Sequence, residues 1–184
     1  MLKTSPAPPF PPQTRRISAP PAPRTERKPL DIVVVLDRSG SMETIANDVI
    51  GGYNRFISDQ RENGNDAKVT LVQFDSRNPH EVVYESTPVG QVPKLTTETF
   101  IPRASTPLLD ATGLLVAKIR EQRALNSAPT NVQDDVVFVT ITDGEENDST
   151  EYSLPKVREL IANCEAEGWT FVYLSAGLDA YGDA

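Results

Sequence analysis

Apolar positions from Leu30 onward follow two periods that alternate along the chain. Short runs rich in β-branched residues, typical of strands buried on both faces, are separated by longer stretches in which apolar residues return every three or four positions, as on one face of a helix. This pattern predicts strands at 32–36, 68–75, 81–89, 136–141 and 170–174. It predicts helices at 43–60, 108–122 and 152–167.

The order of these elements predicts the fold class. Strands that alternate with helices pair in parallel through right-handed crossovers. We therefore expect a three-layer α/β/α, doubly wound, Rossmann-like sheet that is mostly parallel. Segment 81–89 is the exception, because it is short and follows the turn signal Asn78-Pro79; we expect it to be an antiparallel edge strand.

Residues 1–29 have a different composition from the rest of the chain. They contain nine of the 16 prolines, and they cannot bury enough apolar surface to offset the cost of ordering. We predict a disordered, Pro-rich, basic tail at 1–29, with polyproline II character, and a folded domain at 30–184. A plain linker is the favoured interpretation of the tail, and a docking arm is the alternative.

Charge and composition narrow the classes of partner. The tail holds six of the 18 Lys and Arg residues and one of the 26 acids, which leaves the domain with a net charge of about −13. An acidic body argues against nucleic-acid binding and suits a cation site. No apolar run approaches the roughly 20 residues of a membrane span, and no secretory signal is recognisable. With Cys164 as the single cysteine, no disulfide framework is possible, so we expect a cytoplasmic protein.

Oxygen-bearing side chains follow two of the buried strands. Asp37, Ser39 and Ser41 come directly after strand 32–36, and Asp143 follows strand 136–141. In doubly wound sheets ligands bind beyond the carboxyl ends of the strands, and alternate residues of an extended loop point the same way. A donor set made only of oxygen suits a hard cation, with Mg²⁺ or Mn²⁺ ahead of Ca²⁺. The competing interpretation is a Ser/Gly helix cap that binds no metal.

The loop Asp37-x-Ser39-x-Ser41 resembles the metal-ion-dependent adhesion site (MIDAS) motif of von Willebrand factor A (VWA) domains. The segment Ser105-Thr106-Pro107 is similar to the family's threonine loop, and Thr142-Asp143-Gly144 to its aspartate loop. The resemblance covers residues 30–178. It implies five metal-site residues: Asp37, Ser39, Ser41, Thr106 and Asp143.

The resemblance also implies roles for these residues. The three hydroxyls would bind the metal, with Thr106 doing so directly or through water. The two carboxylates would balance its charge, and a Glu or Asp of a protein partner would be the last ligand. Family members usually continue past the fifth strand into another helix and an edge strand, whereas this chain stops at Ala184. An uncovered fifth strand would be a sticky edge, so we expect a partner or a second copy there.

Three function hypotheses follow. The first is a cytoplasmic protein-binding module that looks like bacterial or phage stand-alone members of the family, some of which work beside ATPases or in stress-response and conflict systems. The second is a structural or assembly protein whose contacts run through the sheet edge or the Pro-rich tail. The third is a metal-dependent phosphotransferase or hydrolase.

The sequence argues against the enzyme hypothesis. The single histidine, His80, lies beside Pro79 in a predicted turn, where a surface position is expected, and no phosphate-binding glycine loop follows the first strand. A phosphotransferase that used Asp37 as its nucleophile would need a second aspartate where this chain has Ser39. We therefore expect no catalysis.

Several neighbours have two possible roles. Glu145, Glu146 and Asp148 could form a second cation site or select basic neighbours on a partner, but a solvated acidic loop is favoured. Asp75 could cap a turn or face the site. Asp110 is expected in the first turn of its helix, where a carboxylate suits the helix dipole. A last group is expected to line the rim or pack nearby, with no chemistry assigned: Arg38 and Met42.

Overall fold

The computed structural model describes residues 29–63, 66–126, 134–143 and 146–175. Within them, the strands are β1 (Leu30–Asp37), β2 (Ala67–Asp75), β3 (Asn78–Pro88), β4 (Asp135–Thr142) and β5 (Thr170–Ser175). The helices are the 3-10 helix η1 (Gly40–Ile45), α1 (Ala46–Glu62), the 3-10 helix η2 (Val89–Gln91), α2 (Leu108–Asn126) and α3 (Leu154–Ala166). The predicted tail up to residue 28 and the expected C-terminal shortening fall outside the described residues.

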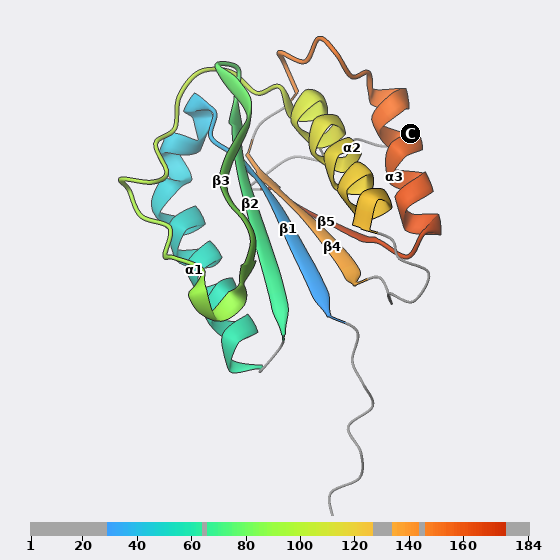
Figure 1. Ribbon diagram of the computed structural model, residues 1–184. Helices are drawn as coiled ribbons and strands as arrows, with labels where there is room; N and C mark the ends of the chain where they lie inside the picture. Colours follow the sequence, from blue (N-terminus) through green and yellow to red (C-terminus); the bar gives the residue numbers. More distant parts are fainter. Residues whose placement is uncertain (1–28, 64–65, 127–133, 144–145, 176–184) are drawn as a thin grey trace, which may run out of the picture.

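The strands form one sheet in the order β3-β2-β1-β4-β5. Strand β3 is antiparallel to β2, and the other neighbours are parallel. Helix α1 covers one face of the sheet, and α2 and α3 cover the other (Figure 1). The predicted three-layer, mostly parallel fold with an antiparallel edge strand is therefore confirmed. The chain passes from β1 to β2 on one side and places β4 on the other, so the carboxyl ends of β1 and β4 lie at the switch point.

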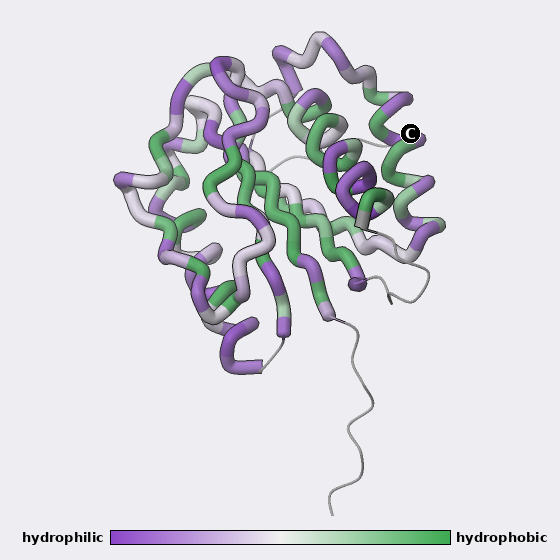
Figure 2. The backbone as a smooth tube through the Cα atoms, in the orientation of Figure 1, coloured by the Kyte–Doolittle hydropathy of each residue, from purple (hydrophilic) through white to green (hydrophobic). Residues whose placement is uncertain are grey.

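Each face of the sheet has its own hydrophobic core, because successive side chains of a strand point to opposite faces. Ile32, Val34 and Leu36 of β1 pack toward α1, whereas Val33 and Val35 pack toward α2 and α3. The inner strands are accordingly apolar along most of their length (Figure 2). The single cysteine, Cys164, is buried in the second core, and Met42 packs in the first rather than on the rim. No described helix is long and apolar enough to cross a membrane.

Two boundaries differ from the sequence prediction. The turn expected at Asn78-Pro79 lies at Ser76 and Arg77 instead, and Asn78 already begins β3. The cause is Asp75, whose Oδ1 accepts the backbone N–H groups of Arg77 at 2.8 Å and Asn78 at 3.1 Å and so tightens the turn before the proline. The helix predicted at 43–60 is divided into η1 and α1.

Candidate metal centre

Four of the five predicted site residues are joined by hydrogen bonds at the carboxyl ends of β1 and β4. The backbone N–H of Ser39 donates to Asp37 Oδ1 at 2.6 Å, and the Ser39 and Ser41 hydroxyls lie 3.1 Å apart. The Ser41 hydroxyl in turn donates to Asp143 Oδ1 at 2.9 Å. The loops that follow the two strands therefore bring two carboxylates and two hydroxyls together.

Ser39 is the residue that would cap the helix if the Asp37–Ser41 loop were only a helix cap without a metal. It occupies the N-cap position of η1, but its side chain makes no capping hydrogen bond. Its hydroxyl lies against Ser41 instead, so the start of the helix leaves this oxygen to the site. Gly40 faces the neighbouring loop, and its N–H donates to the Ala104 carbonyl at 3.0 Å.

Thr106, the fifth predicted ligand, is buried and is placed by its backbone. Its N–H donates to Asn147 Oδ1 at 2.9 Å, and its carbonyl accepts the N–H of Asn147 at 3.2 Å. Its loop also contacts the Asp37–Ser41 loop through the bond between Ala104 and Gly40. Thr106 thus lies on a segment held between the loops that carry the other four residues.

The negative charge of the two carboxylates is not balanced by a cationic side chain among the described residues. Asp37 is fully buried, and burial raises the pKa of its carboxyl; hydrogen bonds from Thr142, at 2.6 Å, and Ser39 oppose the rise, and the nearby Asp143 adds to it. Among the described residues, no Lys or Arg forms an ion pair with Asp37 or Asp143. Two uncompensated carboxylates beside hydroxyls are the oxygen donors that Mg²⁺ or Mn²⁺ prefers, so the residues fit such an ion.

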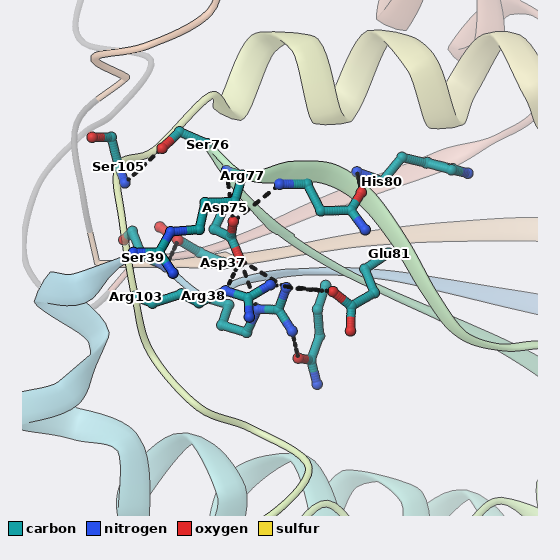
Figure 3. Close-up of polar contacts among 12 residues, drawn as sticks. Asp37, Arg38, Ser39, Asp75, Ser76, Arg77, His80, Glu81, Arg103 and Ser105 are labelled. Atoms are coloured by element: carbon teal, nitrogen blue, oxygen red, sulfur yellow. Dashed lines mark hydrogen bonds and ion pairs between the residues drawn. The ribbon is translucent and has the colours of Figure 1, made fainter.

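A charged cluster beside the site was not predicted from the sequence. Arg38 continues the alternation of β1, so its side chain leaves on the face opposite to Asp37 and reaches Asp75 and Glu81 (Figure 3). Its Nε lies 2.9 Å from Asp75 Oδ2, and its Nη2 lies 2.6 Å from Glu81 Oε2. Arg103 Nε lies 2.9 Å from the same Asp75 oxygen. We call these residues the two-arginine cluster: Arg38, Asp75, Glu81 and Arg103.

The two-arginine cluster shows what Asp75 does. One carboxylate oxygen holds the turn, as one of the two interpretations predicted, and the other binds both arginines rather than the metal-site residues. Burial alone would raise the pKa of Asp75, yet the hydrogen bonds from Arg103, the Arg77 N–H and Arg38 lower it. The sequence signal was limited to an aspartate at a strand end, which does not identify its partners.

Two acidic residues near the site join loops together. Asp110 lies in the first turn of α2, as predicted, and its carboxylate accepts the backbone N–H groups of residues 150–152 at 2.8–2.9 Å. Glu146 is half-exposed, and its carboxylate accepts the N–H groups of Leu109 and Ser149, so it joins two loops in addition to facing solvent. Asp148 is exposed, as expected, and Glu145 lies outside the described residues.

His80 lies in β3 rather than in a turn, which corrects the prediction. Its ring is half-buried against α2, with Nε2 3.4 Å from Lys118 Nζ. Burial and the Lys118 charge both lower the pKa of His80. Within the described part of the chain, its Nδ1 is buried without a hydrogen-bond partner, so no carboxylate orients this ring as a catalytic base.

Comparison with known proteins gives one family and a set of similar folds. The sequence model of the von Willebrand factor type A domain family matches residues 31–181 of this chain. No curated protein sequence matches the chain. Proximal thread matrix protein 1 from the mussel byssus is similar in structure, with a TM-score of 0.50 and 17% identity over 82% of this chain and 36% of that one. A von Willebrand factor type A protein from Catenulispora acidiphila gives a TM-score of 0.52 and 15% identity, over 83% of this chain and 34% of that one.

At these identities the likeness of the two solved structures concerns the fold alone. The chain spans about a third of the length of each. The match of the family model, in contrast, extends over most of the sequence and contains all three loops of the candidate metal centre.

Proposed function

We propose that this chain, which belongs to the von Willebrand factor type A domain family, is a metal-dependent protein-binding module. Members of this family commonly mediate protein–protein interaction. The observation that carries the proposal is the hydrogen-bonded series Asp37–Ser39–Ser41–Asp143, which gathers two carboxylates without a described cationic partner. A divalent cation would neutralise these carboxylates, because a buried charge is costly unless an opposite charge compensates it.

Each residue has a task that follows from its surroundings. Asp37 is fixed by two hydrogen bonds and would balance the charge of the metal. The hydroxyls of Ser39, Ser41 and Thr106 would bind it, with Asp143 completing the charge. Bound Mg²⁺ or Mn²⁺ would supply a Lewis-acidic position that an oxygen from outside the chain can complete. Ser41 is exposed, so a partner would approach on its side.

The partner that this chemistry selects is a protein that offers a Glu or Asp side chain. Two carboxylates and a divalent cation form a roughly neutral site, so an incoming carboxylate is not strongly repelled. We extend the proposal to a cytoplasmic, non-catalytic role, either beside an ATPase or in a stress-response or conflict system. Its basis is the family resemblance of the MIDAS loops.

Titration calorimetry of the metal-free full chain with Mg²⁺ and Mn²⁺ tests the proposal. We expect saturable binding at one site, weakened at least about tenfold in Ser41→Ala and in Asp37→Asn, which lose a ligand and a charge respectively. Ser58→Ala, which removes an exposed hydroxyl from α1, is the matched control and should bind as the wild type does. Equal weak binding by all four proteins would contradict a metal site.

The partner is then sought by capture on the immobilised full chain with Mg²⁺, followed by release with a chelator. A partner held equally well by wild type and Asp37→Asn, and not released by the chelator, would favour the assembly hypothesis over metal-bridged binding. Such a partner would contact the sheet edge or the tail instead of the metal centre.

A further inference from the structure

The two-arginine cluster lies beside the candidate metal centre, because Arg38 stands between Asp37 and Ser39 and its side chain points toward Asp75 and Glu81 (Figure 3). Its two arginines and two acids compensate one another. The Asp75 side chain is inaccessible and that of Arg38 is 6% exposed, whereas Arg103 and Glu81 on the outer side are 38% and 41% exposed. A compensated cluster with a buried centre fixes geometry, because the buried members lose their partners if the others move. The segments that it fixes are those that carry metal-site residues.

The first of these segments is the loop after β1. Arg38 stands between Asp37 and Ser39, and its N–H donates to the Phe74 carbonyl at 2.8 Å, which extends the sheet by one residue. Its side chain is anchored at the end of β2 through Asp75 and through Gln73 Oε1 at 3.3 Å. The orientation of Arg38 therefore sets the point at which the chain leaves the sheet toward Ser39.

The second segment is the loop of Thr106. Arg103, three residues earlier, donates its N–H to the Arg38 carbonyl at 2.7 Å, and its guanidinium binds Asp75 at 2.9 Å. Arg103 thus contacts the backbone of one ligand loop and the carboxylate that anchors it. The cluster is the point at which the two loops are joined.

The backbone between Arg103 and Thr106 needs such an anchor. Ala104 has a φ of 61°, a conformation that residues other than glycine adopt only at an energetic cost. Neighbouring bonds hold it in place: the Ala104 carbonyl accepts from Gly40, and the Ser105 N–H donates to Ser76 Oγ at 3.1 Å. Without the Arg103 contacts, Ala104 would lose the anchor on its N-terminal side and could leave its strained conformation.

We infer that Arg103 and Arg38, locked by Asp75, are positioning residues for the metal centre, which hold the Thr106 loop at the distance from Ser39 and Ser41 that a cation requires. This inference rests on the proposed metal-dependent function and names the residues that regulate its affinity. None of the three is among the five proposed metal-site residues: Arg103 acts through the Thr106 loop and Arg38 through the Asp37–Ser41 loop, and Asp75 holds both arginines.

Electrostatics and positioning predict opposite results for one substitution. Arg103→Gln removes a positive charge near a cation site, so charge alone would strengthen metal binding. Loss of positioning would weaken it, and we expect a decrease of about tenfold in affinity, the lower end of the effect of removing a group that orients a metal ligand. Arg77→Gln, which removes an exposed positive charge from the adjacent turn, is the matched control and should leave the affinity unchanged or slightly higher.

The experiment is calorimetric titration of the metal-free full chains with Mg²⁺ and Mn²⁺, with thermal melting of each metal-free variant alongside. Arg103→Lys keeps the charge but not the planar fork and should lie between wild type and Arg103→Gln. If Arg103→Gln does not fold, the comparison is made with Arg103→Lys, whose expected result is weaker binding than that of the wild type. Unchanged or tighter binding by a folded Arg103 variant would overturn the inference.

A double-mutant cycle with Thr106→Ala shows whether Arg103 acts through Thr106. In that background the loss caused by Arg103→Gln should shrink from about tenfold to about twofold or less, since the group to be positioned is gone. An equal loss in both backgrounds would overturn the inference and leave the proposed function standing. A wild-type chain that binds neither metal, in contrast, would overturn both.

Discussion

At the scale of single residues, the alternation of β1 sends Asp37 and Arg38 to opposite faces of the sheet. Arg38 there meets a second buried aspartate, Asp75, and the surroundings of the two aspartates differ. Burial raises the pKa of Asp37, with Asp143 adding to the rise, and no described cation compensates it. Asp75 is equally buried, but hydrogen bonds from Arg103, the Arg77 N–H and Arg38 overcome burial and lower its pKa. Asp75 is thus compensated by the protein itself, whereas Asp37 has no cationic partner among the described residues, which is the basis of the proposed metal site.

The first prediction at this scale concerns the stability conferred by Asp75. Asp75→Asn removes the buried one of the two carboxylates that the Arg38 guanidinium faces and leaves Arg38, only 5% exposed, with the half-exposed Glu81. Breaking a buried pair by removing one partner costs about 3 kcal/mol, and we expect that decrease in the free energy of unfolding in urea at pH 7 without metal. Asp148→Asn, at an exposed position, should differ from the wild type by less than about 0.5 kcal/mol. Equal stability of the two variants would contradict the structural role of Asp75.

The pH dependence of that difference forms a second prediction. Because the pKa of Asp75 is lowered in the folded state, its ionised form contributes stability that is present above the ordinary aspartate pKa of about 4 and is lost as the pH falls through the lowered value. The difference between wild type and Asp75→Asn should therefore be constant from about pH 7 to pH 5 and shrink toward pH 3. Urea unfolding at each pH measures it. A constant difference down to pH 3 would assign the effect to packing rather than to charge.

At the scale of elements, the loops after the strands show which contacts a sequence reveals. Four of the five proposed ligand positions could be predicted to lie together because their loops follow β1 and β4, and parallel strands end at one edge of the sheet, whereas Thr106 was named from the family resemblance alone. The bonds that join the loops were not, because they link segments far apart in the chain through backbone groups. Glu146 illustrates this: within an acidic stretch its charge favoured a solvated position, yet its carboxylate accepts the N–H of Leu109, 37 residues away.

Helix α2 and the loop before α3 provide the element-scale prediction. A Cβ atom at Gly113 would lie 2.2 Å from Tyr152 Cδ1, and the backbone of Tyr152 is held by Asp110. Gly→Ala within a helix normally stabilises by about 1 kcal/mol, but overpacking costs about 1–3 kcal/mol. We expect Gly113→Ala to destabilise the protein, whereas Gly52→Ala, with open space around its α1 position, should stabilise it. Thermal unfolding decides the sign, and stabilisation by both variants would mean that Tyr152 does not pack against α2.

At the scale of the whole molecule, the fold could be predicted because strand and helix periods alternate over the entire domain. The two-arginine cluster could not, since it depends on pairing register. Glu81 lies opposite Gln73 in the antiparallel pair of β2 and β3, and irregularities in that pair shift which residues face each other. A single sequence gives the period of a strand but not its alignment with a neighbour. For the same reason, the sequence names five candidate site residues but not the residues that we propose to position them.

The last prediction follows from the charge of the molecule as a whole. The net charge of the full chain is −8, so any added cation screens the repulsion between its acidic residues. Only a cation that binds at the metal centre stabilises the folded protein beyond this screening. Mg²⁺ at about 100 times its Kd should add about 2.7 kcal/mol to the free energy of unfolding and raise Tm by about 5 °C or more. A chelator should reverse the shift, and Ser41→Ala, with binding weakened about tenfold, should keep only about 1.4 kcal/mol of it at the same concentration, about half. NaCl at matched ionic strength is the control; if it raises Tm as much as Mg²⁺ does, or if Ser41→Ala responds like the wild type, the stabilisation arises from screening of the acidic domain and not from the metal centre.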